Sequence, residues 1–261
     1  SRLTLGFDFK DYRGQSFATN LSYFTTVLTN NGVASTQNST IALPSNTRVD
    51  VNYMPLSWNW SGERPDKQGT TSFSIEQDVF PSFLESKRAS FQAAADSRSA
   101  GGDYTKVLAG VTREENLRPG WALLWRAAGQ CASEALISNE EFPLGGTAGA
   151  RGYQEGETYG DDGWRTTLEL RAPAAGIGSF PVSGGKVPAF ARTSVFMDYG
   201  EAYLVDRPDA PAVREWGTGV GFFVTAGEHF DARLSLACAL LNTPLTPAGT
   251  LRAYFSIGFQ F

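Results

Sequence analysis

The sequence predicts an all-β protein, a transmembrane antiparallel β-barrel with about ten strands present in the chain. Three observations lead to this fold class. Hydrophobicity alternates with a period of 2 along nearly the whole chain, as in strands with two unlike faces. Most of the alternating segments are close to the ~9–11 residues that cross a bilayer when tilted. The connections between them tend to alternate between shorter and longer, as in outer-membrane barrels.

The alternation is clearest in the last segment, residues 251–261. Its apolar positions are Leu251, Ala253, Phe255, Ile257, Phe259 and Phe261. Its intervening positions are Arg252, Tyr254, Ser256, Gly258 and Gln260. The same pattern recurs upstream, and the strands it predicts lie near residues 2–11, 47–60, 70–80, 103–117, 120–133, 163–173, 187–201, 213–226, 229–241 and 250–261.

The connections fall into two sets if the last strand ends in the periplasm. The set expected to face outward comprises 12–46, 81–102, 134–162, 202–212 and 242–249. The periplasmic set comprises 61–69, 118–120, 174–186 and 226–228. Helical periodicity is weak, and residues 83–97 are the one segment in which we expect a short helix, as an excursion from a connection.

A soluble β-sandwich also alternates, so the side-chain types must separate the two folds. Tryptophans on the apolar face stand near strand ends, which favours the aromatic girdles of a membrane barrel: Trp121, Trp125, Trp164 and Trp216. The net charge is -5, which gives no basic field for nucleic acid. Cys131 and Cys238 have no metal-ligand spacing, and we expect free thiols on lipid-facing positions.

The sequence gives little support to an enzyme. The one histidine, His229, lies in a short connection with no catalytic partner near it in sequence. Carboxylates on the inward parity alternate with arginines, which indicates a mixed-charge lining: Glu76, Asp78, Glu169, Arg165, Arg171, Arg233 and Arg252. We therefore expect no catalytic residue, no cofactor and no metal.

The outward connection 134–162 contains the glycine-dense stretch GGTAGARGYQEGE, residues 145–157. Around it stand further short motifs in a fixed order: Gly129-Gln130, Phe142-Pro143-Leu144-Gly145-Gly146, Ala150-Arg151-Gly152-Tyr153, Glu155-Gly156-Glu157 and Gly160-Asp161-Asp162-Gly163. A second motif, SVFMDYG, follows at residues 194–200, with Phe196, Asp198 and Gly200 in an F-x-D-x-G pattern. The order and spacing of these motifs together are far more specific than Arg-Gly-Tyr alone.

Together these motifs resemble the two-partner secretion transporters (TpsB, the hemolysin secretion/activation proteins), a family within the superfamily of outer-membrane barrel insertases and translocases. One departure is Ala150, where the family usually has valine. The resemblance covers the chain from Ser1 and implies a sixteen-stranded barrel preceded by periplasmic POTRA domains. We therefore expect residues 1–261 to be the C-terminal part of such a barrel domain, without POTRA domains.

The resemblance also implies a function and a site. The implied function is translocation of a secreted exoprotein, unfolded during passage, across the bacterial outer membrane, with outer-membrane lipids and the barrel-assembly machinery as further partners. The alternatives are a passive porin-like or structural barrel with a fixed plug loop and, less favoured, a barrel of the insertase type. The implied loop folds into the lumen, where Arg151 pairs with Asp198.

The residues implied in this site form four groups. The loop latch comprises Arg151, Gly152, Tyr153 and Asp198. The loop motif comprises Gly145, Gly146, Gly156, Asp161 and Gly163, the strand motif Phe196 and Gly200, and the insertion signal Phe261. Independently of the resemblance, Asp198 shares the parity of Arg192, Ser194 and Phe196, which predicts that it points inward.

Overall fold

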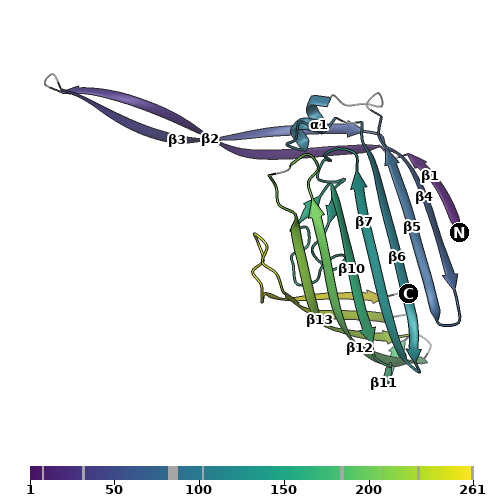
Figure 1. Ribbon diagram of the computed structural model, residues 1–261. Helices are drawn as coiled ribbons and strands as arrows, with labels where there is room; N and C mark the ends of the chain where they lie inside the picture. The colour runs from purple at the N-terminus through teal and green to yellow at the C-terminus, as the bar shows by residue number, and fades with distance from the viewer. Residues whose placement is uncertain are drawn as a thin grey trace.

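The structure, a computed structural model, describes residues 1–7, 9–30, 33–81, 88–101, 103–182, 185–207, 209–227 and 230–259. Its main feature is a curved antiparallel sheet of eleven strands (Figure 1). The first elements are β1 (Arg2–Phe7), β2 (Lys10–Asn30), β3 (Val33–Tyr53), β4 (Leu56–Pro65), β5 (Gly69–Val79), α1 (Arg88–Ala94), β6 (Thr105–Arg118) and β7 (Trp121–Ala132). The remaining elements are β8 (Phe142–Pro143), β9 (Tyr159–Gly160), β10 (Asp162–Arg171), β11 (Ala175–Val182), β12 (Gly185–Tyr203), β13 (Val213–Ala226), β14 (Phe230–Ala239) and β15 (Leu251–Phe259).

The strand order in the main sheet is β1-β4-β5-β6-β7-β10-β12-β13-β14-β15, with β11 paired to β12 beside this path. Every pairing is antiparallel, and most neighbours in the sheet are also neighbours in the chain. Among the described residues β1 pairs with β4 alone and β15 with β14 alone, so the sheet is open. The predicted all-β antiparallel architecture is confirmed.

The two faces of the sheet differ in the way that the alternation predicts. Phe255, Ile257 and Phe259 on β15 are 80%, 60% and 63% exposed. A packed sandwich would bury this face between two sheets, whereas here it is the outer face of one curved sheet. The tryptophans expected in girdles are also on the exposed side: Trp121, Trp125, Trp164 and Trp216. The opposite, inner face carries the polar side chains.

We predict that Phe255→Asp destabilises the protein in lipid vesicles by about 1–2 kcal/mol, less than the ~2–4 kcal/mol of an arginine at mid-bilayer, because a charge on the lipid face of a barrel must leave water. Urea unfolding followed by tryptophan fluorescence measures this loss. The matched control is Ser256→Asp, one residue along the same strand and on the inner face, for which we expect a small change. Equal losses in the two variants would contradict the assignment of the outer face.

Four predicted segments have the wrong bounds. The segment 47–60 is two strands, because Pro55 has no N–H to continue the ladder of β3. The expected outward connection 12–46 is instead paired backbone, the long hairpin of β2 and β3 that projects from one end of the sheet (Figure 1). The expected connection 174–186 contains β11, and the first predicted strand ends at Phe7 rather than running on to residue 11.

A small apolar core closes the end of the sheet from which this hairpin projects. It joins the root of β3, the helix α1 and the first part of the β7–β10 loop, through Val51, Tyr53, Phe80, Phe91, Tyr104, Leu136 and Ile137. The helix lies within the predicted segment 83–97, of which residues 83–87 are outside the described part. Cys131 and Cys238 are free, as predicted. Among the described helices none has the length and apolar content needed to cross a membrane.

Candidate functional site

The loop between β7 and β10, residues 133–161, is fastened at its base by polar side chains. The amide of Gln130 donates to the carbonyls of Glu140 (3.0 Å) and Asp161 (2.9 Å). The buried carboxylate of Asp161 accepts the backbone N–H of Leu136 (2.7 Å) and of Val205 (2.8 Å). These bonds join both legs of the loop to the end of β7 and to the segment after β12.

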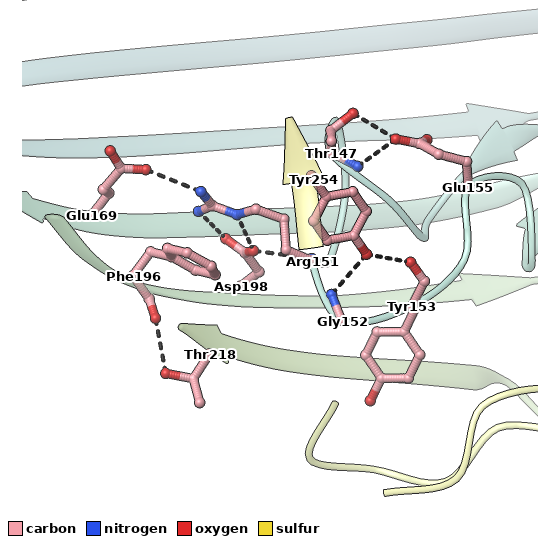
Figure 2. A network of polar contacts seen from close by, with 10 residues as sticks. All are labelled: Thr147, Arg151, Gly152, Tyr153, Glu155, Glu169, Phe196, Asp198, Thr218 and Tyr254. Atoms are coloured by element: carbon pink, nitrogen blue, oxygen red, sulfur yellow. Dashed lines mark hydrogen bonds and ion pairs between the residues drawn. The ribbon is translucent and has the colours of Figure 1, made fainter. Parts of the chain in front are cut away.

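Beyond this base the loop carries Arg151 to the inner face, where it contacts Asp198 of β12 (Figure 2). Its Nε donates to Oδ2 at 2.7 Å and its Nη2 to Oδ1 at 3.0 Å, which is a bidentate pair. The Arg151 backbone N–H donates to the same Oδ2 at 3.0 Å. Asp198 is 0% exposed and Arg151 6%, so this pair is removed from solvent.

A second carboxylate completes the surroundings of the guanidinium. Arg151 Nη1 donates to Glu169 Oε2 at 3.2 Å, and the other oxygen of Glu169 accepts from Arg171 at 3.0 Å. The ring of Phe196 lies under the guanidinium, 3.3 Å from its carbon to the ring centroid. The side chain of Arg151 is therefore held by two carboxylates and an aromatic face, which come from β10 and β12.

Tyr153 ties the same turn of the loop to the last strands. Its buried hydroxyl lies 3.1 Å from the carbonyl of Trp216 and 3.0 Å from that of Leu241, and it accepts the N–H of each. From β15, the hydroxyl of Tyr254 donates to the Tyr153 carbonyl and accepts the N–H of Gly152 (3.0 Å). Residues 151–153 thus bridge five strands of the wall, β10 and β12 to β15.

Two glycines allow the backbones to come this close. Gly152 has φ +110, and a Cβ there would lie 2.7 Å from the N of Ala239 on β14. Gly217 on β13 lies opposite Asp198 in the sheet, and a Cβ there would lie 1.8 Å from the carbonyl oxygen of Arg151. The wall is therefore shaped to receive the loop backbone at this point.

The structure brings the residues of the implied loop latch, Arg151, Gly152, Tyr153 and Asp198, into one cluster with Phe196 of the strand motif. The other motif residues serve the loop around it: Gly145, Gly146, Gly156, Asp161 and Gly163 lie in the loop and at the start of β10, and Gly200 lies under the Leu144 side chain. Phe261 lies outside the described residues. What each residue does in function stays a prediction.

Sequence reasoning missed several residues of this cluster. Glu169, Arg171 and Arg252 stood out only as a mixed-charge lining, although Arg252 also donates to the Gly152 carbonyl at 3.1 Å. Tyr254 gave no signal beyond its inward parity. Such contacts join residues about 100 positions apart in the chain, which alternation along one strand does not reveal.

A second polar cluster, also missed, surrounds Glu140 at the base of the loop. Its carboxylate, 2% exposed, accepts from Lys10 at 2.6 Å, from Lys106 and from the hydroxyl of Tyr53. Burial opposes the ionised form, and the two lysines outweigh it and lower the pKa of Glu140. Since Lys10 and Tyr53 belong to the root of the β2–β3 hairpin, this cluster couples that hairpin to the loop.

The pKa of the neighbouring Glu141 is shifted in the opposite direction. Burial, with a smaller contribution from Asp161, raises the pKa of Glu141 to about 7. The folded pKa therefore lies above that of an unfolded glutamate, and the folded state loses stability as pH rises towards 7.

We predict that Glu141→Gln leaves stability unchanged near pH 4 and raises it at pH 8 by about 1–2 kcal/mol, a value reduced for partial solvation. Hydrogen exchange of the amides of residues 134–141 measures the effect. Glu63→Gln, at an exposed position of β4, is the control. Parallel pH curves for the wild type and Glu141→Gln would contradict the prediction.

Comparison with known proteins finds a matching family and similar solved structures. A family model described as haemolysin secretion/activation protein ShlB/FhaC/HecB matches residues 12–224. Among solved structures, CdiB from Escherichia coli is similar with a TM-score of 0.62 and 17% sequence identity, over 98% of this chain and 49% of that chain. The chain thus spans about half the length of that structure, and at this identity the likeness shows the fold. No curated protein matches.

Proposed function

We propose, because the chain belongs to the haemolysin secretion/activation protein family ShlB/FhaC/HecB, that it takes part in moving a secreted partner protein across the bacterial outer membrane. This family is one of transporters rather than enzymes, and the likeness to two-partner secretion transporters expected from the motifs is confirmed. In this proposal residues 1–261 form the C-terminal part of an outer-membrane barrel domain. The partner passes unfolded, and the barrel meets lipids and the assembly machinery during its biogenesis.

The observation that carries the proposal is the position of the loop across the inner face. Residues 151–153 bridge strands from β10 to β15 and therefore lie where a polypeptide would have to pass. A transporter with this arrangement must displace the loop to open a path. The docked loop is then the resting, closed arrangement.

The chemistry of the docking fits a loop that leaves and returns. Its contacts are mostly polar: the ion pairs of Arg151, the hydroxyl bonds of Tyr153 and Tyr254, and the bond from Arg252 to the loop backbone. Water can take over each of these bonds when residues 151–153 move out, and the apolar surface exposed there is mainly the small cluster of Ala150, Tyr153 and Ala239. A loop packed by large apolar side chains would instead expose them to water.

Site-specific photocrosslinking in living cells tests the transport function. A photoreactive residue at Ser256, on the inner face, should crosslink to an exoprotein that disappears from the medium when this chain is removed. The same residue at Ile257, on the exposed outer face of β15, should not. If the chain can be removed with no change in the secreted proteins, the proposal fails.

A second candidate is a passive barrel with a fixed plug loop, and the anchoring of Tyr153 to both Trp216 and Leu241 favours it. The two candidates differ in whether the loop must move. Joining engineered cysteines at Glu157 and Thr243, whose side chains are hydrogen-bonded to each other, with a short bifunctional reagent should stop secretion in a transporter. It should leave the conductance of a passive barrel unchanged.

A further inference from the structure

A groove of about 420 Å³ lies on the inner wall beside the docked loop, over β5, β6, β7 and β10. The loop residue Ala148 also lines it, and its polar lining comes from Ser72, Ser74, Thr112, Arg126, Arg165, Thr166 and Thr167. Two arginines and several hydroxyls are all donors of hydrogen bonds, and the lining contains no carboxylate. The groove therefore has the chemistry of an anion site.

The two arginines stand close to each other. Arg126 of β7 lies opposite Thr167 of β10, and Arg165 lies opposite Ala128, so they are diagonal neighbours on adjacent strands. Diagonal neighbours on one face of a sheet are about 7–8 Å apart, and like charges placed so repel. An anion bound between them would remove this repulsion.

Neither arginine has a carboxylate partner in the described part of the chain. The guanidinium of Arg126 makes no hydrogen bond or ion pair there, and that of Arg165 donates to the Pro143 carbonyl at 2.8 Å and stacks on the Phe142 ring. The nearest carboxylates of the inner wall, Asp198 and Glu169, are already bound by Arg151 and Arg171. Glu155 of the loop also acts on Arg165 from a distance, so the positive charge of the groove is offset only in part and without a direct ion pair.

We propose that the Arg126–Arg165 groove binds oxyanions, and that its ligands are the carboxylate side chains of the polypeptide in transit. This assignment rests on the proposed function for the source of the ligand, while the oxyanion chemistry follows from the groove alone. The planar fork of each guanidinium matches a carboxylate, which a lysine would hold only as a point charge. Because the groove is open to water, each contact is weak and exchanges rapidly, as a conducting path requires.

The position of the groove relates this binding to the loop. Since Ala148 borders the groove, movement of residues 145–150 away from the wall widens access to both arginines. Acidic segments of a passing chain would then meet Arg126 and Arg165 directly beside the loop latch. The groove favours polypeptides with acidic stretches over neutral ones.

Peptide binding to the full chain in detergent micelles tests the assignment. The probes are a fluorescent peptide rich in glutamate, the same peptide with glutamine in its place, and inorganic phosphate as a competitor. We expect the glutamate peptide to bind at low salt and to lose at least about tenfold in affinity in the double variant Arg126→Gln/Arg165→Gln. The control, Arg64→Gln/Arg118→Gln, removes the same charge at exposed positions away from the groove, and it should bind as the wild type does.

Each outcome has one meaning, provided that heat-modifiable mobility shows every variant folded. Equal binding of the glutamate and glutamine peptides, or undiminished binding in the double variant, overturns the assignment of the groove as an oxyanion site. Binding of phosphate without binding of the glutamate peptide overturns the assignment to polypeptide carboxylates. If the chain binds the peptide as expected but crosslinks to no exoprotein, the transport function is contradicted and the oxyanion binding by the groove is not.

Discussion

Arg151→Ala is expected to reduce secretion of the partner protein at least about tenfold while the barrel still assembles. The substitution removes the only cation that contacts Asp198 within the described residues. Of the two buried carboxylates, Glu169 keeps its ion pair with Arg171 and Asp198 keeps none. Removing one partner of a buried ion pair is destabilising by about 3–5 kcal/mol. We expect the loop to leave the wall while the barrel stays folded, because release of the loop returns both carboxylates to water and so removes most of this cost.

Three readouts separate the steps of this prediction. Heat-modifiable mobility reports folding, protease cleavage within residues 145–157 reports release of the loop, and exoprotein in the medium reports transport. Arg151→Lys should be intermediate, since an ammonium keeps the charge but not the bidentate geometry. The exchange Arg151→Asp with Asp198→Arg should restore part of the function. Normal secretion by a folded Arg151→Ala protein would leave the loop as a structural tie or fixed plug.

Much of the fold could be predicted because alternation is a local property of the chain. In the strands β10 to β15, the alternation of apolar and polar residues within each strand is enough to distinguish its two faces. The inward parity of Asp198 follows from its neighbours on β12 alone. Because the prediction depended on this alternation, it missed the β2–β3 hairpin. In its sequence, serine, threonine and asparagine stand at odd and even positions alike, as the run Ser35 to Thr40 illustrates, so hydrophobicity shows no period of 2 there.

The site was predictable only in part. The Arg151–Asp198 contact was implied by a family resemblance and by parity, whereas Glu169 and Tyr254 join it through the three-dimensional path of the loop. That path depends on small residues as much as on charged ones. Gly217 in β13 has no chemical signal in the sequence, yet it lies where the loop backbone meets the wall.

Gly217→Ala is therefore expected to release the loop without altering any charge. A Cβ at this position would lie 1.8 Å from the carbonyl oxygen of Arg151, less than any real contact, so the loop must move away by more than about 1 Å. Hydrogen bonds of 2.7 and 3.0 Å from Arg151 to Asp198 do not survive such a shift. The strand itself tolerates the change, because alanine adopts extended backbone and restricts the unfolded chain more than glycine does.

The variant should show the cleavage within residues 145–157 and the loss of secretion expected of Arg151→Ala. Its barrel should still assemble, and the urea concentration at which it unfolds should be lowered by no more than Arg151→Ala lowers it. Because both substitutions break the same contact, the double variant Arg151→Ala/Gly217→Ala should be little worse than either one alone. Gly176→Ala, at a position with no atom within 4 Å of the added Cβ, is the control and should secrete normally. Normal secretion by Gly217→Ala, with the loop still protected from protease, would show that close docking on β13 is not what holds the loop.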